Sequence, residues 1–242
     1  MKTYTFNNKE YSDIYTLAKE MYLDCSSFAV ELRSNNLLEF IQEQSQEKYD
    51  KIKALSLMAL PDDVFVFKAS YILNPYMTFR LNNYIFDDYQ KMGEKMLSTS
   101  PNYDTVLIEM VRYNLLSEQI YISGYYKGHE EFYEDIKEIE QQAVDNHLLG
   151  YFLLAYYLSK KKTIIYKKKE YKDIYNFCYY IFRSNVDLNE LGSYLSNSPL
   201  LIAYSKYSDD RIKVDEYLHI CSELKKSEMK LEKFLSKRNE TI

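Results

Sequence analysis

Two groups of three lysines are the residues most suited to binding a ligand in this sequence of 242 residues. They are Lys160, Lys161 and Lys162, followed by Lys167, Lys168 and Lys169, and Tyr166 directly precedes the second group. Lysines beside an aromatic ring can follow a phosphate backbone while the ring stacks on a base. Lysines also protect an exposed edge strand from aggregation. The pattern therefore predicts either a nucleic-acid-binding segment or a purely structural one.

A run of carboxylates precedes this basic segment in the chain. The residues Glu130, Glu131, Glu134, Asp135, Glu138 and Glu140 are spaced to form an acidic helix face. Such a face partly repels nucleic acid but attracts a basic protein partner, or the basic end of a second copy of the chain. Tyrosine, which occurs 27 times, is enriched in protein interfaces. We therefore expect a protein partner, with nucleic acid as the alternative, and leave the oligomeric state open.

The residues that usually carry catalysis form no recognisable set. His129 and His147 are 18 residues apart, which on one helix is roughly 27 Å and too far to share a metal. His219 lies further along the chain, and five glycines are too few for a phosphate-binding loop. Cys25 on an apolar helix stripe is interpreted as core packing rather than as a nucleophile. We predict no catalytic residue, metal or cofactor, and an enzyme is the third alternative.

Composition limits the class of protein further. Hydrophobic residues make up 46% of the chain and charged residues 28%, which is typical of a folded domain. The net charge of −5 argues against a protein that mainly holds nucleic acid. Three widely spaced cysteines fit a reducing cytosol, and no apolar stretch reaches the roughly 18 residues of a membrane helix. We expect a cytoplasmic protein without membrane contact, and the abundance of Tyr, Lys, Ile and Asn indicates a bacterial or phage genome.

One short pattern occurs three times, at residues 4–15, 79–89 and 164–175, which begin 75 and 85 residues apart. Each copy has a short apolar segment, a polar pair and a second short segment ending in an aromatic residue. The pairs are Asn7 with Asn8, Asn82 with Asn83, and Lys167 with Lys168. Asn tolerates the positive φ of a two-residue primed turn, so the pattern predicts three β-hairpins. Lysine is a poorer turn residue, which leaves the turn type of the third hairpin open.

Helix signals follow each hairpin. Asp13, Asp88 and Asp173 stand where a helix N-cap is expected, and apolar residues follow at three- and four-residue spacing. A second helix then ends before a Leu-Leu pair, at residues 37–38, 115–116 and 200–201. Helical segments are also expected over 37–60, 129–146 and 148–158, and a long one over 208–236. The predicted fold is α+β and predominantly α-helical, with three tandem modules at 1–75, 76–160 and 161–242.

The order of strand, polar turn, aromatic residue, acid-capped helix and Leu pair resembles repeats appended to some bacterial Hsp70-like, FHA-type and kinase-type signalling proteins. The resemblance covers roughly 40 residues of each copy, and it implies a regulatory or scaffolding accessory without an active site. Repetition without a catalytic set points the same way, because repeated units multiply binding surface. We predict a non-enzymatic regulatory or scaffold protein that binds another protein, and the candidate contacts are the lysines around Tyr166 and the acidic helix from Glu130. The alternative is a nucleic-acid-associated factor, such as a phage or defence-linked regulator of a nucleic-acid enzyme.

Overall fold

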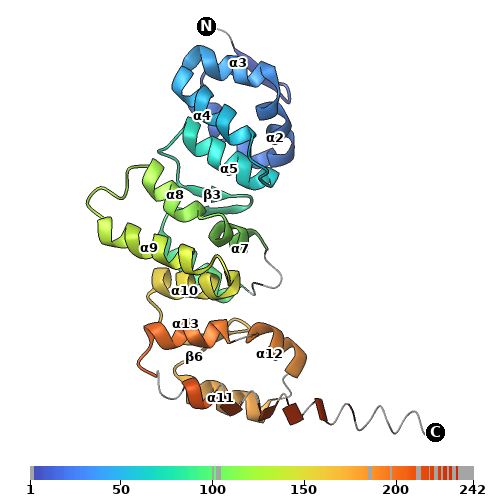
Figure 1. Cartoon of the computed structure of the whole chain (residues 1–242), viewed down its shortest axis with the longest axis vertical. Coiled ribbons are helices and arrows are strands. Elements are labelled where there is room, and N and C mark those ends of the chain that lie inside the picture. The colour runs from blue at the N-terminus through green and yellow to red at the C-terminus, as the bar shows by residue number, and fades with distance from the viewer. Residues whose placement is uncertain are drawn as a thin grey trace, which may run out of the picture.

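The computed structural model shows a predominantly helical α+β fold, which confirms the predicted fold class. The N-terminal helices lie at one end of an elongated molecule and the third hairpin lies near the other (Figure 1). The structure describes residues 3–99, 101, 105–184, 187–196 and 198–210, and then 214–217, 219–220, 223–224, 226–227, 229–230 and 233. None of the described helices combines the length and the apolar character that crossing a membrane requires.

The described elements begin three times with a hairpin and continue with helices. The first series is β1 (Tyr4–Phe6), β2 (Lys9–Tyr11), α1 (Ile14–Ala18), the 3-10 helix η1 (Met21–Asp24), α2 (Cys25–Arg33), α3 (Asn35–Gln44), α4 (Gln46–Ser56) and α5 (Asp62–Leu73). The second is β3 (Phe79–Leu81), β4 (Tyr84–Phe86), α6 (Tyr89–Ser98), α7 (Thr105–Arg112), α8 (Leu115–Ile122), α9 (Glu130–Gln142) and α10 (His147–Ser159). The third is β5 (Ile164–Tyr166), β6 (Lys169–Tyr171), α11 (Ile174–Arg183), α12 (Leu188–Tyr194) and α13 (Pro199–Tyr207).

All three predicted hairpins are present, and each is a separate antiparallel pair with a two-residue turn. Both residues of the first turn have positive φ, as the Asn pair predicts, while in the second turn Asn82 does. In the third, Lys167 and Lys168 have φ of 48° and 63°, so the lysine turn has the same left-handed backbone as the first. The hydrogen-bond ladder and the packing of the hairpin therefore override the poor turn propensity of lysine.

The predicted N-caps are confirmed at all three helices that follow the hairpins. The carboxylates of Asp13, Asp88 and Asp173 accept hydrogen bonds from backbone N–H groups two or three residues later, at 2.6–2.9 Å. Each aspartate has extended backbone, as an N-cap requires. These short local signals fix where the helices begin, and hence how each helix leaves its hairpin.

Two apolar helices, α5 and α10, join the successive parts of the molecule. The helix α5 packs on α1, α2 and α4 and also on β3 and α8 of the next series. In the same way α10 packs on α6, α7 and α9 and on α13 of the third series. Figure 1 shows α10 between α9 and α13. Both helices are apolar on nearly every side because both sides are covered. The parts therefore pack against one another, whereas module boundaries at residues 75 and 160 stay a prediction.

Two expected helical stretches differ from the observed ones. Residues 37–60 contain two helices, because Ser45 has extended backbone and its side chain caps α4 through the N–H of Lys48 at 3.4 Å. The long C-terminal helix begins later than residue 208, since Ser208 and Asp209 form a bend and Val214 is the first described helical residue. The backbone oxygen of Asp210 accepts from the N–H of Val214 at 3.1 Å. Much of 211–236 lies outside the described residues.

Candidate binding sites

The first candidate site is the exposed side of α9. Glu130, Glu131, Glu134 and Glu138 are all exposed, on the face opposite the buried Ile136 and Ile139 of the same helix. One ion pair partly neutralises this face, because Lys137 lies 3.6 Å from Glu134. The backbone N–H of Gly128 binds Glu130 at 2.9 Å and holds the pKa of that carboxyl below its usual range. The face therefore carries a clear negative excess at neutral pH.

Glu140 does not belong to this acidic face, contrary to the sequence-based expectation. Its side chain is 1% exposed and accepts hydrogen bonds from the N–H groups of Leu116 and Ser117, both at 3.3 Å, at the start of α8. Asp135 is also engaged, because Tyr157 donates its hydroxyl to that carboxylate at 2.7 Å. Glu140 is buried because it follows Ile136 by four residues, which places both side chains on the same buried face of the helix.

Aromatic rings flank the acidic face on both sides, and sequence reasoning did not single them out. One set joins Tyr121, Tyr126 and Tyr133 with ring centres 5.1–6.2 Å apart. The other set joins Tyr89, Tyr125, Phe132, Tyr157 and Tyr207 at 5.3–6.2 Å. Tyr121 is 57% and Tyr125 41% exposed. In the sequence, these clusters were indicated by aromatic residues that recur at four-residue spacing before and inside α9.

A glycine-bounded loop places these rings beside the carboxylates. Gly124 and Gly128 have φ of 75° and 85°, so the chain between α8 and α9 turns back tightly. Tyr125 and Tyr126 lie inside this loop, and the ring of His129 stacks on Tyr125 at 4.1 Å. We call Glu130, Glu131, Glu134 and Glu138, together with Tyr121, Tyr125, Tyr126, Phe132 and Tyr133, the acidic–aromatic surface.

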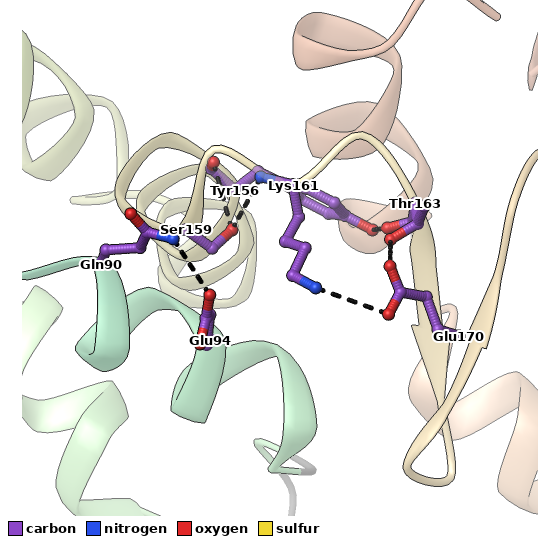
Figure 2. Close-up of polar contacts among 7 residues, drawn as sticks. All are labelled: Gln90, Glu94, Tyr156, Ser159, Lys161, Thr163 and Glu170. Atoms are coloured by element: carbon purple, nitrogen blue, oxygen red, sulfur yellow. Dashed lines mark hydrogen bonds and ion pairs between the residues drawn. The ribbon is translucent and has the colours of Figure 1, made fainter.

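The first lysine group lies between the end of α10 and the start of β5, and Figure 2 shows Lys161 there. Lys160 has a left-handed backbone with φ of 54° and ends α10. Lys161 donates its N–H to the hydroxyl of Ser159 at 3.2 Å, and its ammonium lies 3.5 Å from Glu170. Lys162 lies 3.5 Å from Asp209. Two of these three lysines therefore have carboxylate neighbours, which oppose the binding of a phosphate backbone.

The second lysine group is at the turn of the third hairpin, at the far end of β5. Lys167 forms an ion pair of 2.7 Å with Glu190 of α12. Lys168 is exposed, and Lys169 lies over the rings of Tyr171 and Tyr180, at 5.3 and 4.8 Å from their centres. Tyr166 is 1% exposed and belongs to the core, so its ring cannot stack on a nucleic-acid base in this conformation.

A pocket lies beside this turn and is the second candidate site. It has a volume of about 510 Å³, within the usual range of small-ligand sites. Its described lining comes from the end of α6, the hairpin turn and α12: Lys95, Leu97, Ser98, Thr99, Tyr166, Lys167, Lys168, Glu190, Ser193 and Tyr194. Three lysines face one glutamate, so the pocket is positively charged. Sequence reasoning found the turn lysines but missed Lys95 and Glu190, which come from distant segments.

The Cys25 thiol is not activated as a nucleophile. Burial, followed by the nearby Asp63 carboxylate, raises the pKa of the Cys25 thiol to about 11, so the thiolate is scarce at neutral pH. The Nδ1 atom of His129 lies 3.0 Å from the backbone oxygen of Tyr125. Within the described residues, no three His, Cys, Asp or Glu side chains are grouped as metal ligands.

No protein-family model, curated protein or solved structure matches the chain. The resemblance to the repeats of bacterial signalling proteins therefore stays a prediction.

Proposed function

We propose that the chain is a non-enzymatic binding protein that recognises a basic segment of a protein partner through the acidic–aromatic surface. The observation that carries the proposal is the arrangement on α9, where exposed carboxylates lie between two sets of aromatic rings. Arginine and lysine side chains bind carboxylates through their charge and also lie over aromatic faces. A partner rich in arginine or lysine satisfies both features at once.

The same interaction already occurs within the chain. The ammonium of Lys137 lies 5.7 Å from the ring centre of Tyr133 and 3.6 Å from the carboxylate of Glu134. A basic side chain of a partner would meet the same kinds of groups at the exposed carboxylate of Glu130 and the exposed ring of Tyr125. Cation–π contacts at exposed sites contribute about 0.5–1 kcal/mol each, so several must act together to give useful affinity.

Nucleic acid is the weaker candidate. Of the six lysines that suggested it, Lys161, Lys162 and Lys167 each lie within 3.5 Å of a carboxylate. Lys169 is stacked over two tyrosine rings of its own chain. Tyr166 and Tyr171 are also buried, so neither ring can stack on a base of single-stranded nucleic acid in this conformation.

A direct binding experiment tests the proposal. The chain contains no tryptophan, so a single tryptophan in an arginine-rich peptide reports binding by its own fluorescence. We expect the peptide to bind the unmodified protein and to bind the triple variant Glu131→Gln, Glu134→Gln, Glu138→Gln about tenfold or more weakly. Replacing Tyr125 by Ala should also weaken binding, because it removes a ring and leaves all charges in place.

The matched control removes three exposed carboxylates elsewhere, through Glu39→Gln, Glu43→Gln and Glu47→Gln on α3 and α4. This variant has the same net charge as the first, so a general electrostatic attraction would weaken equally in both. Affinity within about twofold of the unmodified protein in the control supports a specific surface. Equal loss in both triple variants, or no binding by the unmodified protein, rejects the proposal.

A further inference from the structure

The second and third hairpins each pack on residues at or just beyond the end of a helix in the preceding part of the chain. The β3–β4 hairpin lies against the segment after α1, and the β5–β6 hairpin lies against the end of α6. The offsets of 75 and 85 residues between the hairpins relate the two junctions residue by residue. A position at which the two junctions have different residues therefore marks a change in one of two otherwise equivalent arrangements.

The first junction is filled. Asn82 donates to the carboxylate of Asp63 at 3.3 Å, and the thiol of Cys25 lies 3.5 Å from the side-chain oxygen of Asn82. The guanidinium of Arg80 lies over the ring of Tyr22, 4.9 Å from its centre. About 10 Å³ of space is left between these groups, too little for any ligand.

The second junction is open, because the residues that fill the first one are replaced. Lys167 stands in the place of Asn82 and extends to Glu190, 2.7 Å away on α12. Leu148 is at the position that corresponds to Asp63, so the second junction lacks the carboxylate that accepts from Asn82 in the first. Leu97 is at the position that corresponds to Tyr22, so the aromatic ring is also missing. The result is the pocket of about 510 Å³.

The replaced residues are mostly basic. Lys95 in the last turn of α6 corresponds to Glu20, and Lys168 corresponds to Asn83. With Lys167, they place three ammonium groups around the pocket, and among the described lining residues Glu190 alone carries a carboxylate. The hydroxyls of Ser98, Thr99 and Ser193 also line it. Ammonium and hydroxyl donors together are the groups that bind phosphate oxygens.

The hydroxyl of Tyr166 adds an independent observation. Tyr166 lines the pocket, and its buried hydroxyl oxygen has no hydrogen-bond partner. A buried donor without an acceptor is uncommon and costs about 1–3 kcal/mol. Lys167 lies 5.7 Å from the centre of this ring and is held on Glu190.

We propose that the pocket between α6, the β5–β6 turn and α12 binds a phosphate-bearing small molecule. The site is independent of the acidic–aromatic surface on α9. The lysine turn then forms one wall of a ligand pocket. Ligand binding explains why this turn has lysines where the other two hairpins have Asn. Lys95 supplies the second wall and also offsets the partial negative charge at the end of α6.

Calorimetry with inorganic pyrophosphate and with ATP at low salt tests this site in the full chain. The decisive variant is Lys167→Asn with Lys168→Asn, which restores the turn residues of the first two hairpins and removes two charges. Lys95→Gln removes the charge from the opposite wall. The matched control is Lys160→Asn, because Lys160 also has positive φ and is exposed but does not line the pocket. Thermal unfolding of each variant verifies that it is folded.

We expect at least one of the two phosphate probes to bind, with affinity reduced about tenfold or more by the double variant and severalfold by Lys95→Gln. Lys160→Asn should bind within about twofold of the unmodified chain. Absence of binding by both probes overturns the proposal. So does an equal loss in Lys160→Asn, which would indicate general surface charge. A single-stranded oligonucleotide that binds more tightly than ATP and is weakened by Lys160→Asn would assign the lysines to nucleic acid instead.

Discussion

The backbone N–H of Ser117 donates a hydrogen bond of 3.3 Å to the carboxylate of Glu140, which joins the start of α8 to the end of α9. The N-cap residue of α8, Asn114, has a left-handed backbone and makes no side-chain cap. Glu140 supplies the missing acceptor from another helix and also accepts from Leu116. Because its side chain is 1% exposed, burial raises the pKa of Glu140 to about 7, although these hydrogen bonds oppose the rise.

This raised pKa predicts a pH dependence of stability. The folded state holds a proton on Glu140 up to about pH 7, whereas the unfolded chain releases it near the ordinary value of 4.5. The folded state binds more protons between these values, so the contribution is fully present below pH 4.5 and is lost as pH rises to about 7. The loss is about 3 kcal/mol if no other group compensates. Urea unfolding of Glu140→Gln across this range should show a flatter profile, and an unchanged slope would contradict the assignment.

Gly93 of α6 lies directly against the end of α10. A Cβ atom at this position would lie 2.4 Å from the backbone nitrogen of Ser159 and 2.8 Å from the backbone oxygen of Ala155. Backbone atoms cannot move aside cheaply, so we expect Gly93→Ala to destabilise the fold by about 3 kcal/mol. Gly192→Ala is the control, because nothing lies within 4 Å of its Cβ and helix α12 should gain about 0.5–1 kcal/mol. Similar denaturation midpoints for the two variants would contradict this packing.

Short-range signals explain which parts of this fold could be predicted. The Asn pairs and Asp13, Asp88 and Asp173 act on backbone within a few residues, so the hairpins and the N-caps follow directly from them. The burial of Glu140 was also readable in principle, from its four-residue spacing to Ile136. The pocket was not, because Lys95, Lys168 and Glu190 come together only after α6, the third hairpin and α12 have packed. Comparing the three copies position by position would have marked Lys95 as the residue that replaces Glu20.

The turn of the third hairpin allows a reciprocal exchange with the first. Lys167 and Lys168 have φ of 48° and 63°, close to the 47° and 60° of Asn7 and Asn8. Asn adopts this backbone more easily than Lys, and the exposed ion pair of Lys167 with Glu190 adds little. We expect the double Lys-to-Asn variant to raise Tm by roughly 1–3 °C. Asn7→Lys with Asn8→Lys should lower Tm by a similar amount, and a fall in both variants would show that the lysines stabilise their own turn.

Two buried tyrosines tie the apolar helices to the hairpins that follow them, and their hydroxyls differ in what they bind. The hydroxyl of Tyr71 donates to the backbone oxygen of Thr78 at 2.6 Å and accepts from the N–H of Arg80 at 2.9 Å. The hydroxyl of Tyr156 donates to the backbone oxygen of Thr163 at 3.2 Å, as Figure 2 shows. Tyr71→Phe therefore leaves two backbone groups without a partner, and the corresponding change at Tyr156 leaves one.

We expect Tyr71→Phe to lower the free energy of unfolding by about 2–3 kcal/mol and Tyr156→Phe by about 1 kcal/mol. Urea denaturation with a shared m-value measures both. Tyr76→Phe is the control, since that side chain is 84% exposed and its replacement should change stability by less than about 0.5 kcal/mol. A larger loss at Tyr156 than at Tyr71 would mean that the second link carries more of the stability, and that the count of hydrogen bonds does not decide the strength of these links.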